Sequence, residues 1–271
     1  MDNRPIGVFD SGLGGLTVIR ELEHVLPHEN LIYFGDTGRV PYGTKGNDTI
    51  MKYAEQIVRF LRGFDVKAIL IACGTVSSVA FDVVSALAEV PVYGVVEPAA
   101  RSAVEKSSQG DILILGTSAT VRSGSYEKAI KRLNPDAVVR SGACPLFVPL
   151  VENDHFSKDD VLADMVAHEY LDTFLNRGVD TVILGCTHYP ILRPLIAGIM
   201  GESVALVDAG SEMADTAAVS LEVRGLLSDR KDIGKQNFYV SDYSEDFTRL
   251  AGVLLEHSLA GYVEKTDIEK Y

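Results

Sequence analysis

Residues 182–190 read Val-Ile-Leu-Gly-Cys-Thr-His-Tyr-Pro and place three reactive side chains at the end of a predicted strand. Residues 182–184 form a β-branched and aliphatic run, which is typical of a strand buried on both faces of a parallel sheet. Gly185 ends this run, so we expect Cys186 where the strand opens into a loop. Pro190 can begin the next helix, because it lacks only an N–H group that would have no partner there. Ligands of parallel α/β sheets bind at the carboxyl ends of strands. The sequence therefore predicts a thiol, a hydroxyl and an imidazole at a favoured position for a site.

Apolar runs alternate with helical patterns along the rest of the chain. This alternation predicts the α/β class, with mostly parallel sheets flanked by helices. The predicted strands cover residues 6–9, 31–34, 66–73, 92–95, 112–115, 138–139, 182–184, 205–207 and 238–240. The predicted helices cover residues 16–26, 47–63, 76–87, 158–177, 212–226 and 245–259, and a further helix follows the turn at residues 116–120. We expect the helix over residues 158–177 to end at Gly178, since glycine is common just after helices.

The composition limits the classes of partner. The chain has 271 residues, a length that favours two domains, and a net charge of −13 with a pI near 4.9. An acidic surface without a basic stripe disfavours nucleic acid and anionic membranes. No apolar run approaches the ~18 residues of a membrane span, and the first residues lack the pattern of a secretory leader. We therefore expect a cytoplasmic protein that binds neither nucleic acid nor membrane.

The three cysteines are Cys73, Cys144 and Cys186. They form no CxxC pair and have no regular spacing, which argues against a zinc site or a disulfide framework. A lone free cysteine is usually buried and inert, but two of these have matching surroundings. Residues 62–65 (Arg-Gly-Phe-Asp) precede the strand that ends in Cys73, and residues 177–180 (Arg-Gly-Val-Asp) precede the one that ends in Cys186. We infer two similar α/β halves that present their thiols to one cleft from opposite sides.

Two opposed thiols suit proton transfer at a single carbon atom. One thiolate can remove a proton from one face while the other thiol returns a proton to the opposite face, which inverts the configuration. General acid–base catalysis of this kind depends first on geometry and then on pKa. A pyridoxal cofactor would require a lysine for its Schiff base, and no lysine lies beside the predicted site turns. We therefore expect a mechanism without cofactor or metal.

The turn at residues 10–15, Asp-Ser-Gly-Leu-Gly-Gly, allows two further interpretations. A glycine-rich turn between a strand and a helix can bring backbone N–H groups to a phosphate. The spacing is not that of the dinucleotide motif G-x-G-x-x-G, so this interpretation is weak. Asp10 and Ser11 can also cap the following helix.

Several motifs in order resemble the cofactor-independent aspartate/glutamate racemase family. They are residues 6–15 (IGVFDSGLGG), 40–43 (VPYG), 72–75 (ACGT), 97–98 (EP), 116–120 (GTSAT), 144–152 (CPLFVPLVE) and 184–190 (LGCTHYP), and the resemblance extends to about Asp208. It implies two pseudo-symmetric α/β domains, formed by residues 1–97 plus 208–271 and by residues 98–207, with the active site between them. It also implies that the protein interconverts L- and D-glutamate without a cofactor and supplies D-glutamate for peptidoglycan synthesis. Members of the family are often dimers, so a homodimer is one implied assembly.

The resemblance assigns roles to individual residues. Cys73 matches the cysteine that takes the α-proton from D-glutamate, and Cys186 matches the one that takes it from L-glutamate. Asp10 and His188 match side chains that support the thiols and contact the substrate, and Asp36 and Glu152 are weaker candidates for support. The remaining positions expected to hold the substrate are Ser11, Tyr42, Gly43, Gly74, Thr75, Thr117, Thr120 and Thr187. Cys144 matches no catalytic position and is interpreted as structural.

Gly74 departs from the pattern of the family, which usually has asparagine there. The missing amide would hydrogen-bond the substrate, so Gly74 bears on affinity and on substrate choice. We expect a bound water to replace the amide, because glycine leaves room for one. On this view Gly74→Asn stays active. The competing account is a positive φ at Gly74, which would strain other residues.

Three alternatives to glutamate racemisation remain. The first is racemisation of aspartate or another amino acid. The second is a thiol hydrolase that uses Cys186 and His188, although it leaves Cys73 without a role. The third, outside the enzymes, is a phosphate- or nucleotide-binding module built on residues 12–15.

Overall fold

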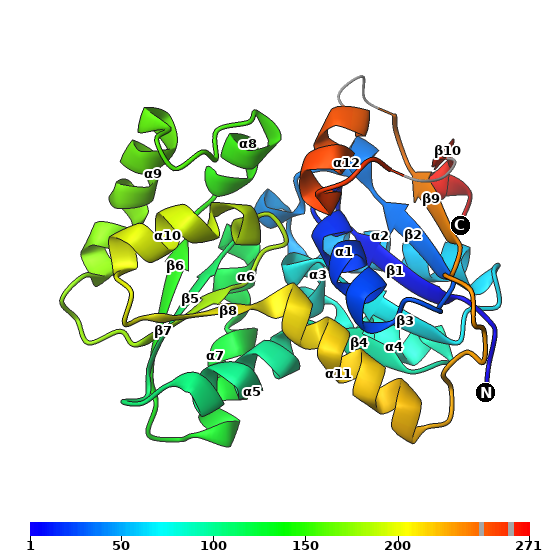
Figure 1. Cartoon of the computed structure of the whole chain (residues 1–271), viewed down its shortest axis with the longest axis horizontal. Helices are drawn as coiled ribbons and strands as arrows, with labels where there is room; N and C mark the ends of the chain where they lie inside the picture. The colour runs from blue at the N-terminus through cyan, green and yellow to red at the C-terminus, as the bar shows by residue number, and fades with distance from the viewer. Residues whose placement is uncertain (244–246, 260–262) are drawn as a thin grey trace.

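The computed structural model describes residues 1–243, 247–259 and 263–271 and consists of two α/β lobes side by side (Figure 1). The large lobe contains a six-stranded sheet with the strand order β10-β9-β2-β1-β3-β4. Its strands are β1 (Ile6–Asp10), β2 (Leu31–Gly35), β3 (Ala68–Ile71), β4 (Val92–Gly94), β9 (Gln236–Val240) and β10 (Val263–Lys265). The small lobe contains a four-stranded sheet with the order β6-β5-β7-β8. Its strands are β5 (Asp111–Gly116), β6 (Val138–Ala143), β7 (Thr181–Leu184) and β8 (Ala205–Asp208).

All of the pairings between these strands are parallel, which confirms the predicted fold class. The order β2-β1-β3-β4 in the large lobe corresponds to β6-β5-β7-β8 in the small lobe. In this correspondence β3, which precedes Cys73, takes the same place as β7, which precedes Cys186. The repeated pattern that surrounds the two cysteines in the sequence is therefore a repeated sheet in the structure.

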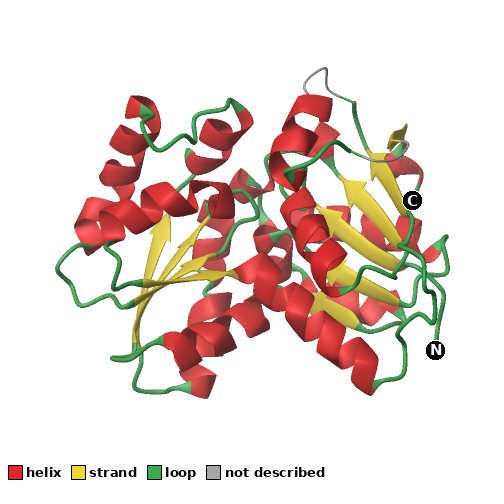
Figure 2. Ribbon diagram, viewed as in Figure 1, coloured by secondary structure: helices red, strands yellow, loops and turns green. Residues whose placement is uncertain are grey.

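Helices cover both faces of each sheet (Figure 2). In the large lobe, α1 (Leu16–Val25), α11 (Ala209–Val223) and α12 (Phe247–Leu255) pack with the side chains of Ile6 and Val8. On the opposite face, α2 (Asn47–Arg62) and α4 (Phe81–Ala88) pack with Phe9. This division follows from strand geometry, because successive side chains point to opposite faces of a sheet. The other helices are α3 (Gly74–Val79), α5 (Val96–Lys106), α6 (Ser118–Ser123), α7 (Ser125–Leu133), α8 (Phe147–Glu152), α9 (Val161–Leu171) and α10 (Arg193–Met200).

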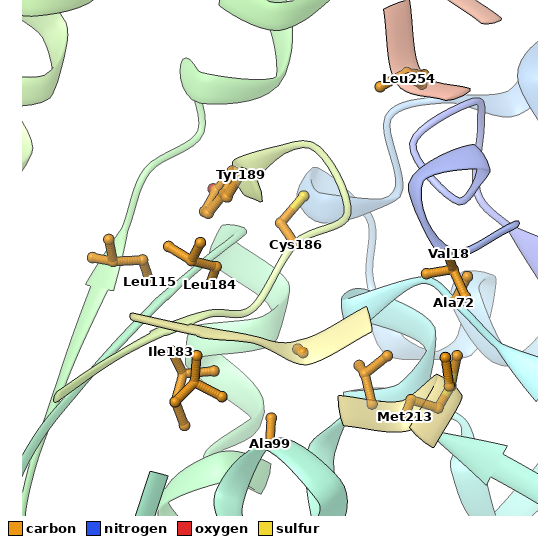
Figure 3. Packing of buried hydrophobic residues seen from close by; sticks show 14 of the residues in the cluster. Val18, Ala72, Ala99, Leu115, Ile183, Leu184, Cys186, Tyr189, Met213 and Leu254 are labelled. Atoms are coloured by element: carbon orange, nitrogen blue, oxygen red, sulfur yellow. The ribbon is translucent and has the colours of Figure 1, made fainter. Parts of the chain in front are cut away.

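One buried apolar cluster continues from the small lobe into the large one (Figure 3). It joins Ile183 and Leu184 of β7 to Val18 of α1 and Met213 of α11. The lobes therefore share part of their core. The predicted domain boundaries at residues 97 and 208 fall in the first turn of α5 and at the end of β8, and this division stays a prediction.

Several predicted helices are wrong in their extent. The helix predicted over residues 212–226 spans Ala209–Val223, and the last helix ends at Leu255 instead of at residue 259. The helix predicted over residues 76–87 is interrupted at Ala80, which separates α3 from α4. Helix α3 packs against α2 and against α6 of the small lobe, and α4 packs against α2. The helix predicted over residues 158–177 begins only after Asp160, whose carboxylate accepts a hydrogen bond from Ala163 N at 3.0 Å. It ends at Leu171 and continues as a short 3₁₀ helix. Gly178 lies beyond it with φ of +87° and does not cap it.

Several short elements were not predicted from the sequence. They are α5, α8 and β10. Helix α5 has Pro98 in its first turn, where the missing N–H group of proline costs no hydrogen bond. The predicted start of the last helix at residue 245 lies outside the described residues. In the part of the chain that the structure describes, no helix combines the length and the apolar character that a membrane span requires.

Candidate active site

Cys73 and Cys186 line the same cavity, which has a volume of about 270 Å³ and lies between the lobes. The large lobe contributes Ser11, Gly12, Val40, Pro41, Tyr42, Gly43, Thr44, Cys73, Gly74 and Thr75. The small lobe contributes Thr117, Ser118, Pro145, Val148, Pro149, Glu152, Cys186, Thr187 and His188. A larger hollow of about 1120 Å³, lined mainly by residues 77–101 and 123–132, contains neither thiol. The smaller cavity is therefore the candidate active site.

Three of the predicted site residues do not line the cavity. Asp10, Asp36 and Thr120 are each at most 2 % exposed and lie behind residues that do line it. Thr120 Oγ1 is 3.1 Å from Thr117 Oγ1, and its N–H group donates to the same oxygen. Thr120 thus holds the cavity residue Thr117 in place, and its contact with substrate stays a prediction.

Cys73 is placed by the end of strand β3. Ala72 N donates to Phe9 O at 3.0 Å, so the ladder with β1 extends one residue beyond β3. Cys73 then occupies the N-cap position of α3, and its carbonyl accepts a hydrogen bond from Ser77 N at 2.9 Å. The thiol therefore lies at the carboxyl end of a central strand, as the sequence predicted.

Cys186 is placed by the corresponding loop after β7. Gly185 N donates to Leu115 O at 2.8 Å, which fixes the start of the loop against β5. Tyr189 N donates to Cys186 O at 3.0 Å, and Tyr189 OH donates to Cys144 O at 2.8 Å. Cys144 is fully buried away from the cavity, which agrees with its interpretation as a structural residue.

A buried carboxylate lies close to the Cys73 thiol. Cys73 Sγ is 3.4 Å from Ser11 Oγ and is 4 % exposed. Burial raises the pKa of Cys73 to about 12, and the charge of Asp10 adds to this effect. The pKa of Asp10 is itself raised by burial, although the charge of His188 and the Gly12 N–H group oppose the shift. Cys73 is therefore a protonated thiol at neutral pH.

A histidine backed by a carboxylate lies close to the Cys186 thiol. Cys186 Sγ is 4.0 Å from His188 Nδ1, and His188 Nε2 is 3.1 Å from Glu152 Oε1. Burial lowers the pKa of His188, but the contacts with Cys186 and Glu152 outweigh it and raise the pKa to about 10. The imidazole is therefore protonated at neutral pH, and Glu152 orients it.

Hydroxyl groups of both lobes meet across the cavity. Thr75 Oγ1 of the large lobe is 2.9 Å from Thr117 Oγ1 of the small lobe. Thr17 Oγ1 donates to Thr187 O at 3.1 Å, which ties α1 to the Cys186 loop. Small hydroxyls of this kind can donate to carboxylate oxygens, and they can also accept from an ammonium group.

Asp36 supports the loop that carries Tyr42. Tyr42 OH donates to the Asp36 carboxylate, and Arg39 Nε donates to the same oxygen at 2.7 Å. Arg39 Nη1 also donates to Gln56 Oε1 at 2.6 Å. Burial raises the pKa of Tyr42, and the Asp36 charge raises it further, so the phenol stays protonated. Asp36 acts on the cavity wall through Tyr42.

The structure bears on both explanations for glycine at position 74, which were a positive φ and room for a bound water. Its φ is not positive, so backbone strain does not require glycine. A Cβ atom at Gly74 would lie 2.0 Å from the carbonyl oxygen of Gly185 in the other lobe. The space along the side-chain direction is therefore occupied by backbone, which argues against a bound water in that direction. The expectation that Gly74→Asn stays active remains a prediction.

The turn at residues 10–15 does not cap a helix with its side chains. Helix α1 begins after Gly15 and receives no side-chain cap, whereas Asp10 Oδ2 accepts a hydrogen bond from Gly12 N at 3.0 Å.

The cavity walls also include Ser118 and Val148, which the sequence analysis missed. Ser118 follows the carboxyl end of β5, and Val148 follows that of β6. This position after a strand was the sequence feature that could have identified them as cavity residues. Among the described residues, no group of three or more His, Cys, Asp or Glu is arranged to hold a metal ion.

Comparison with known proteins agrees with this geometry. The family model for Asp/Glu/Hydantoin racemase matches residues 6–217, which include both cysteines. The chain belongs to this racemase family. It is 43 % identical to the glutamate racemase of Geobacter metallireducens over 266 residues, covering 98 % of this chain and 97 % of that protein.

Solved structures of other members of the family have the same arrangement of lobes. The glutamate racemase of Francisella tularensis in complex with D-glutamate superposes with a TM-score of 0.94 at 38 % identity, covering 100 % of both chains. The glutamate racemase of Thermus thermophilus in complex with β-chloro-D-alanine superposes with a TM-score of 0.89 at 41 % identity, again covering 100 % of both chains. The fold of the family thus extends over the whole of this chain.

Proposed function

We propose that this protein is a glutamate racemase that interconverts L- and D-glutamate with two thiols and no cofactor. The observation that carries the proposal is the pair Cys73 and Cys186, which occupy matching strand ends and line one cavity. The family membership supports a racemase, and the high identity to glutamate racemases supports glutamate as the substrate. The product D-glutamate would serve peptidoglycan synthesis and so bear on cell shape.

In the direction from L- to D-glutamate, Cys186 acts as the base. The protonated imidazole of His188 lies beside Cys186, with Nδ1 4.0 Å from Sγ. A thiolate is the form of a cysteine that can accept a proton. The Cys186 thiolate removes the α-proton, and the electron pair of the broken C–H bond stays on the α-carbon. The Cys73 thiol then gives its proton to the opposite face of that carbon and becomes a thiolate.

In the direction from D- to L-glutamate, the two thiols exchange roles. Cys73 removes the α-proton and Cys186 returns one, so the enzyme must begin with the opposite protonation of the pair. Each turnover leaves the enzyme in the form that accepts the other enantiomer. Proton exchange with water then restores the resting form, in which Cys73 is protonated.

The substrate would be held by groups that line the cavity on both sides. Ser11, Tyr42, Gly43 and Thr75 come from the large lobe, and Thr117 and Thr187 come from the small lobe. Hydroxyl and backbone N–H groups suit the two carboxylates of glutamate, and bonds to charged groups are the stronger ones. Binding between the lobes also removes water from the α-carbon.

Circular dichroism tests the proposal directly. Purified protein incubated with L-glutamate, and separately with D-glutamate, and with no added cofactor, is expected to bring both signals to zero. Chelator dialysis is expected to leave the rate unchanged. Retention of both signals would contradict the proposal. A panel with aspartate and other amino acids identifies the substrate if another amino acid is racemised faster.

The proposal includes a homodimer in the cytoplasm as the working form. Light scattering during size-exclusion chromatography measures the mass, which for one chain is 29.3 kDa. A dimer is expected near twice this mass, and a monomer at all concentrations would contradict this part of the proposal.

A further inference from the structure

The two thiols lie deep in a cavity that a substrate has to enter and leave in every turnover. Cys73 is 4 % exposed and Cys186 is 9 % exposed, whereas the side chain of Glu152, which lines the same cavity, is 38 % exposed. Glu152 therefore marks the rim of the cavity on the side of the small lobe. Contacts between the lobes at such a rim control how firmly the cavity holds its ligand.

Helix α8 forms this part of the rim and belongs to the small lobe. Phe147 and Val151 are fully buried, and the ring of Phe147 packs edge to face against Tyr189. The helix has six residues and ends at Glu152. A helix this short has little stability of its own. The position of its last turn over the cavity therefore depends on the contacts that hold this end.

The C-terminal end of α8 is joined to the large lobe by Arg249 of α12. Figure 1 shows α12 on the side of the large lobe that faces α8. Arg249 Nη1 donates to the Asp154 carboxylate, and Arg249 Nη2 donates to Glu152 O at 3.3 Å. Helix α12 is anchored in its own lobe, where Phe247 and Leu254 are buried and the helix packs against α1. One guanidinium group of the large lobe thus binds the small lobe at the rim of the cavity.

We infer that the ion pair of Arg249 with Asp154 is a latch, which holds the end of α8 against the large lobe and keeps the cavity closed over bound glutamate. Arg249 is then a positioning residue that acts through α8. The inference rests on the proposed function, because glutamate is the ligand that the closed cavity would retain. The two side chains are 39 % and 51 % exposed, and exposed ion pairs are weak. A weak latch suits a site that has to open for each product molecule.

The charge of Arg249 offers a competing explanation for any change in affinity. Glutamate is an anion, and a cation at the rim would attract it without any latch. Asp154 separates the two explanations, because removal of its charge would lower KM if the rim charges act by attraction. The same removal would raise KM if the ion pair holds the lobes together. Asp154→Asn suits this test, since Asp154 has φ of +63° and asparagine tolerates that conformation.

The kinetic experiment measures KM and kcat for L- and D-glutamate in the wild type, in Arg249→Met, in Asp154→Asn and in the double variant. We expect KM for both enantiomers to rise about 5-fold in Arg249→Met and about 3-fold in Asp154→Asn, the range for an exposed ion pair. We expect kcat to stay within about 2-fold of the wild type, because the latch acts on closure and not on the thiols. The double variant is expected to match Arg249→Met, since one interaction is lost only once. This cycle isolates the pair, because Arg249 also interacts elsewhere.

The chain offers a matched control for the loss of an exposed arginine. Arg59 Nη2 is 3.0 Å from Glu55 Oε2, and both residues lie on α2, with side chains that are 47 % and 37 % exposed. This pair joins two turns of one helix and does not cross between lobes. We expect KM of Arg59→Met to stay within about 1.5-fold of the wild type.

Hydrogen exchange with mass spectrometry gives a readout that does not depend on activity. The N–H groups of Asn153, Asp154 and His155 donate to carbonyl oxygens of α8 at 3.1, 3.2 and 2.8 Å. We expect the peptide that contains them to exchange faster in Arg249→Met and in Asp154→Asn than in the wild type or Arg59→Met, because the end of α8 is released. If Arg249→Met does not fold, Asp154→Asn decides by the sign of its change in KM and by its exchange.

Four results would overturn the inference. They are a lower KM in Asp154→Asn, independent effects of the two substitutions in the double variant, a fall in kcat at unchanged KM, and unchanged exchange at the end of α8. Absence of glutamate racemisation in the wild type would instead contradict the proposed function. Exchange would in that case still decide whether the ion pair holds α8.

Discussion

The two thiols occupy equivalent places in two similar sheets, yet the ionisable side chains beside them differ. Cys73 lies near the buried carboxylate Asp10, whereas Cys186 lies near His188, which Glu152 backs. The negative charge and the burial keep the first thiol protonated, with a pKa of about 12. The protonated imidazole of His188 lies beside the second thiol. In the proposed mechanism, a repeated backbone places an acid and a base on opposite sides of one carbon atom.

In the proposed mechanism, the form of the enzyme with a protonated Cys73 accepts L-glutamate, because Cys73 has to give a proton to the α-carbon. The free energies of L- and D-glutamate are equal, so kcat/KM must remain equal in the two directions whatever the asymmetry of the site. The difference between the two thiols therefore cannot be measured from kcat/KM, but it can be measured from isotope effects, thiol reactivity and stability.

Removal of either thiol is expected to have the largest effect. Cys73→Ala and Cys186→Ala each take away one of the two proton-transfer groups, so racemisation is expected to fall about 10⁴-fold, the upper range for general acid–base groups. Cys144→Ala is the matched control, since Cys144 is a buried thiol outside the cavity. Polarimetry measures the rates, and substantial racemisation by either of the first two variants would exclude the two-thiol mechanism.

His188→Gln is expected to reduce kcat/KM about 10²-fold in both directions, because it removes the cation beside Cys186. The loss lies in the step at Cys186, so proton removal from L-glutamate becomes slower relative to all other steps. The kinetic isotope effect with α-deuterated L-glutamate is therefore expected to increase. An isotope effect that increases only with α-deuterated D-glutamate would assign His188 to the other thiol.

Asp10→Asn is expected to make Cys73 more reactive and the enzyme less active. The Asp10 charge raises the pKa of Cys73, so its removal lowers that pKa and increases the thiolate fraction at a given pH. Alkylation of Cys73 by iodoacetamide, followed by mass spectrometry across pH 7–10, is expected to shift to lower pH. The alkylation profile of Cys73 in the wild type is the reference. An unchanged profile for Cys73 would show that Asp10 does not act on this thiol.

The smallest predicted effect concerns stability. The folded pKa of His188, about 10, is above its ordinary value of 6.5, so its contribution to stability is complete below pH 6.5 and is lost as pH rises towards 10. The melting temperature of the wild type is expected to fall across this interval, and that of His188→Gln to fall less. Burial raises the pKa of Cys73 from 9.0 to about 12, so the stability of both the wild type and His188→Gln is expected to fall as pH rises from 9 to 12. Parallel profiles from pH 6.5 to 9 would contradict the protonated state of His188.

Much of the fold could be predicted from local patterns. Continuous apolar runs identified the central strands of both sheets, because parallel strands are buried on both faces. The repeat of Arg-Gly-x-Asp before both cysteine strands indicated the correspondence of β3 and β7. The carboxyl ends of these strands then placed most of the cavity residues. The edge strand β10 and helix α8 were missed because three and six residues carry too little periodicity to be recognised.

The features of the site that could not be predicted from the sequence depend on contacts that local patterns do not indicate. Gly74 and Gly185 are far apart in the sequence, and no local pattern indicates that their backbones meet. Asp36 lies only six residues before Tyr42, but no local pattern indicated that its carboxylate accepts a hydrogen bond from the Tyr42 hydroxyl. The sequence therefore predicted which groups react, whereas the spacing of these groups depends on how the two lobes pack.

The most direct test of the two-thiol mechanism follows the α-proton in deuterated water. Wild-type protein is incubated with L-glutamate, and proton NMR after separation of the enantiomers measures deuterium in each during the first turnovers. The mechanism predicts deuterium at the α-carbon of the D-glutamate formed, since Cys73 carries a proton exchanged with solvent, while unreacted L-glutamate keeps its α-proton. D-glutamate that retains the original proton would show that one group removes and returns it, and would contradict the account.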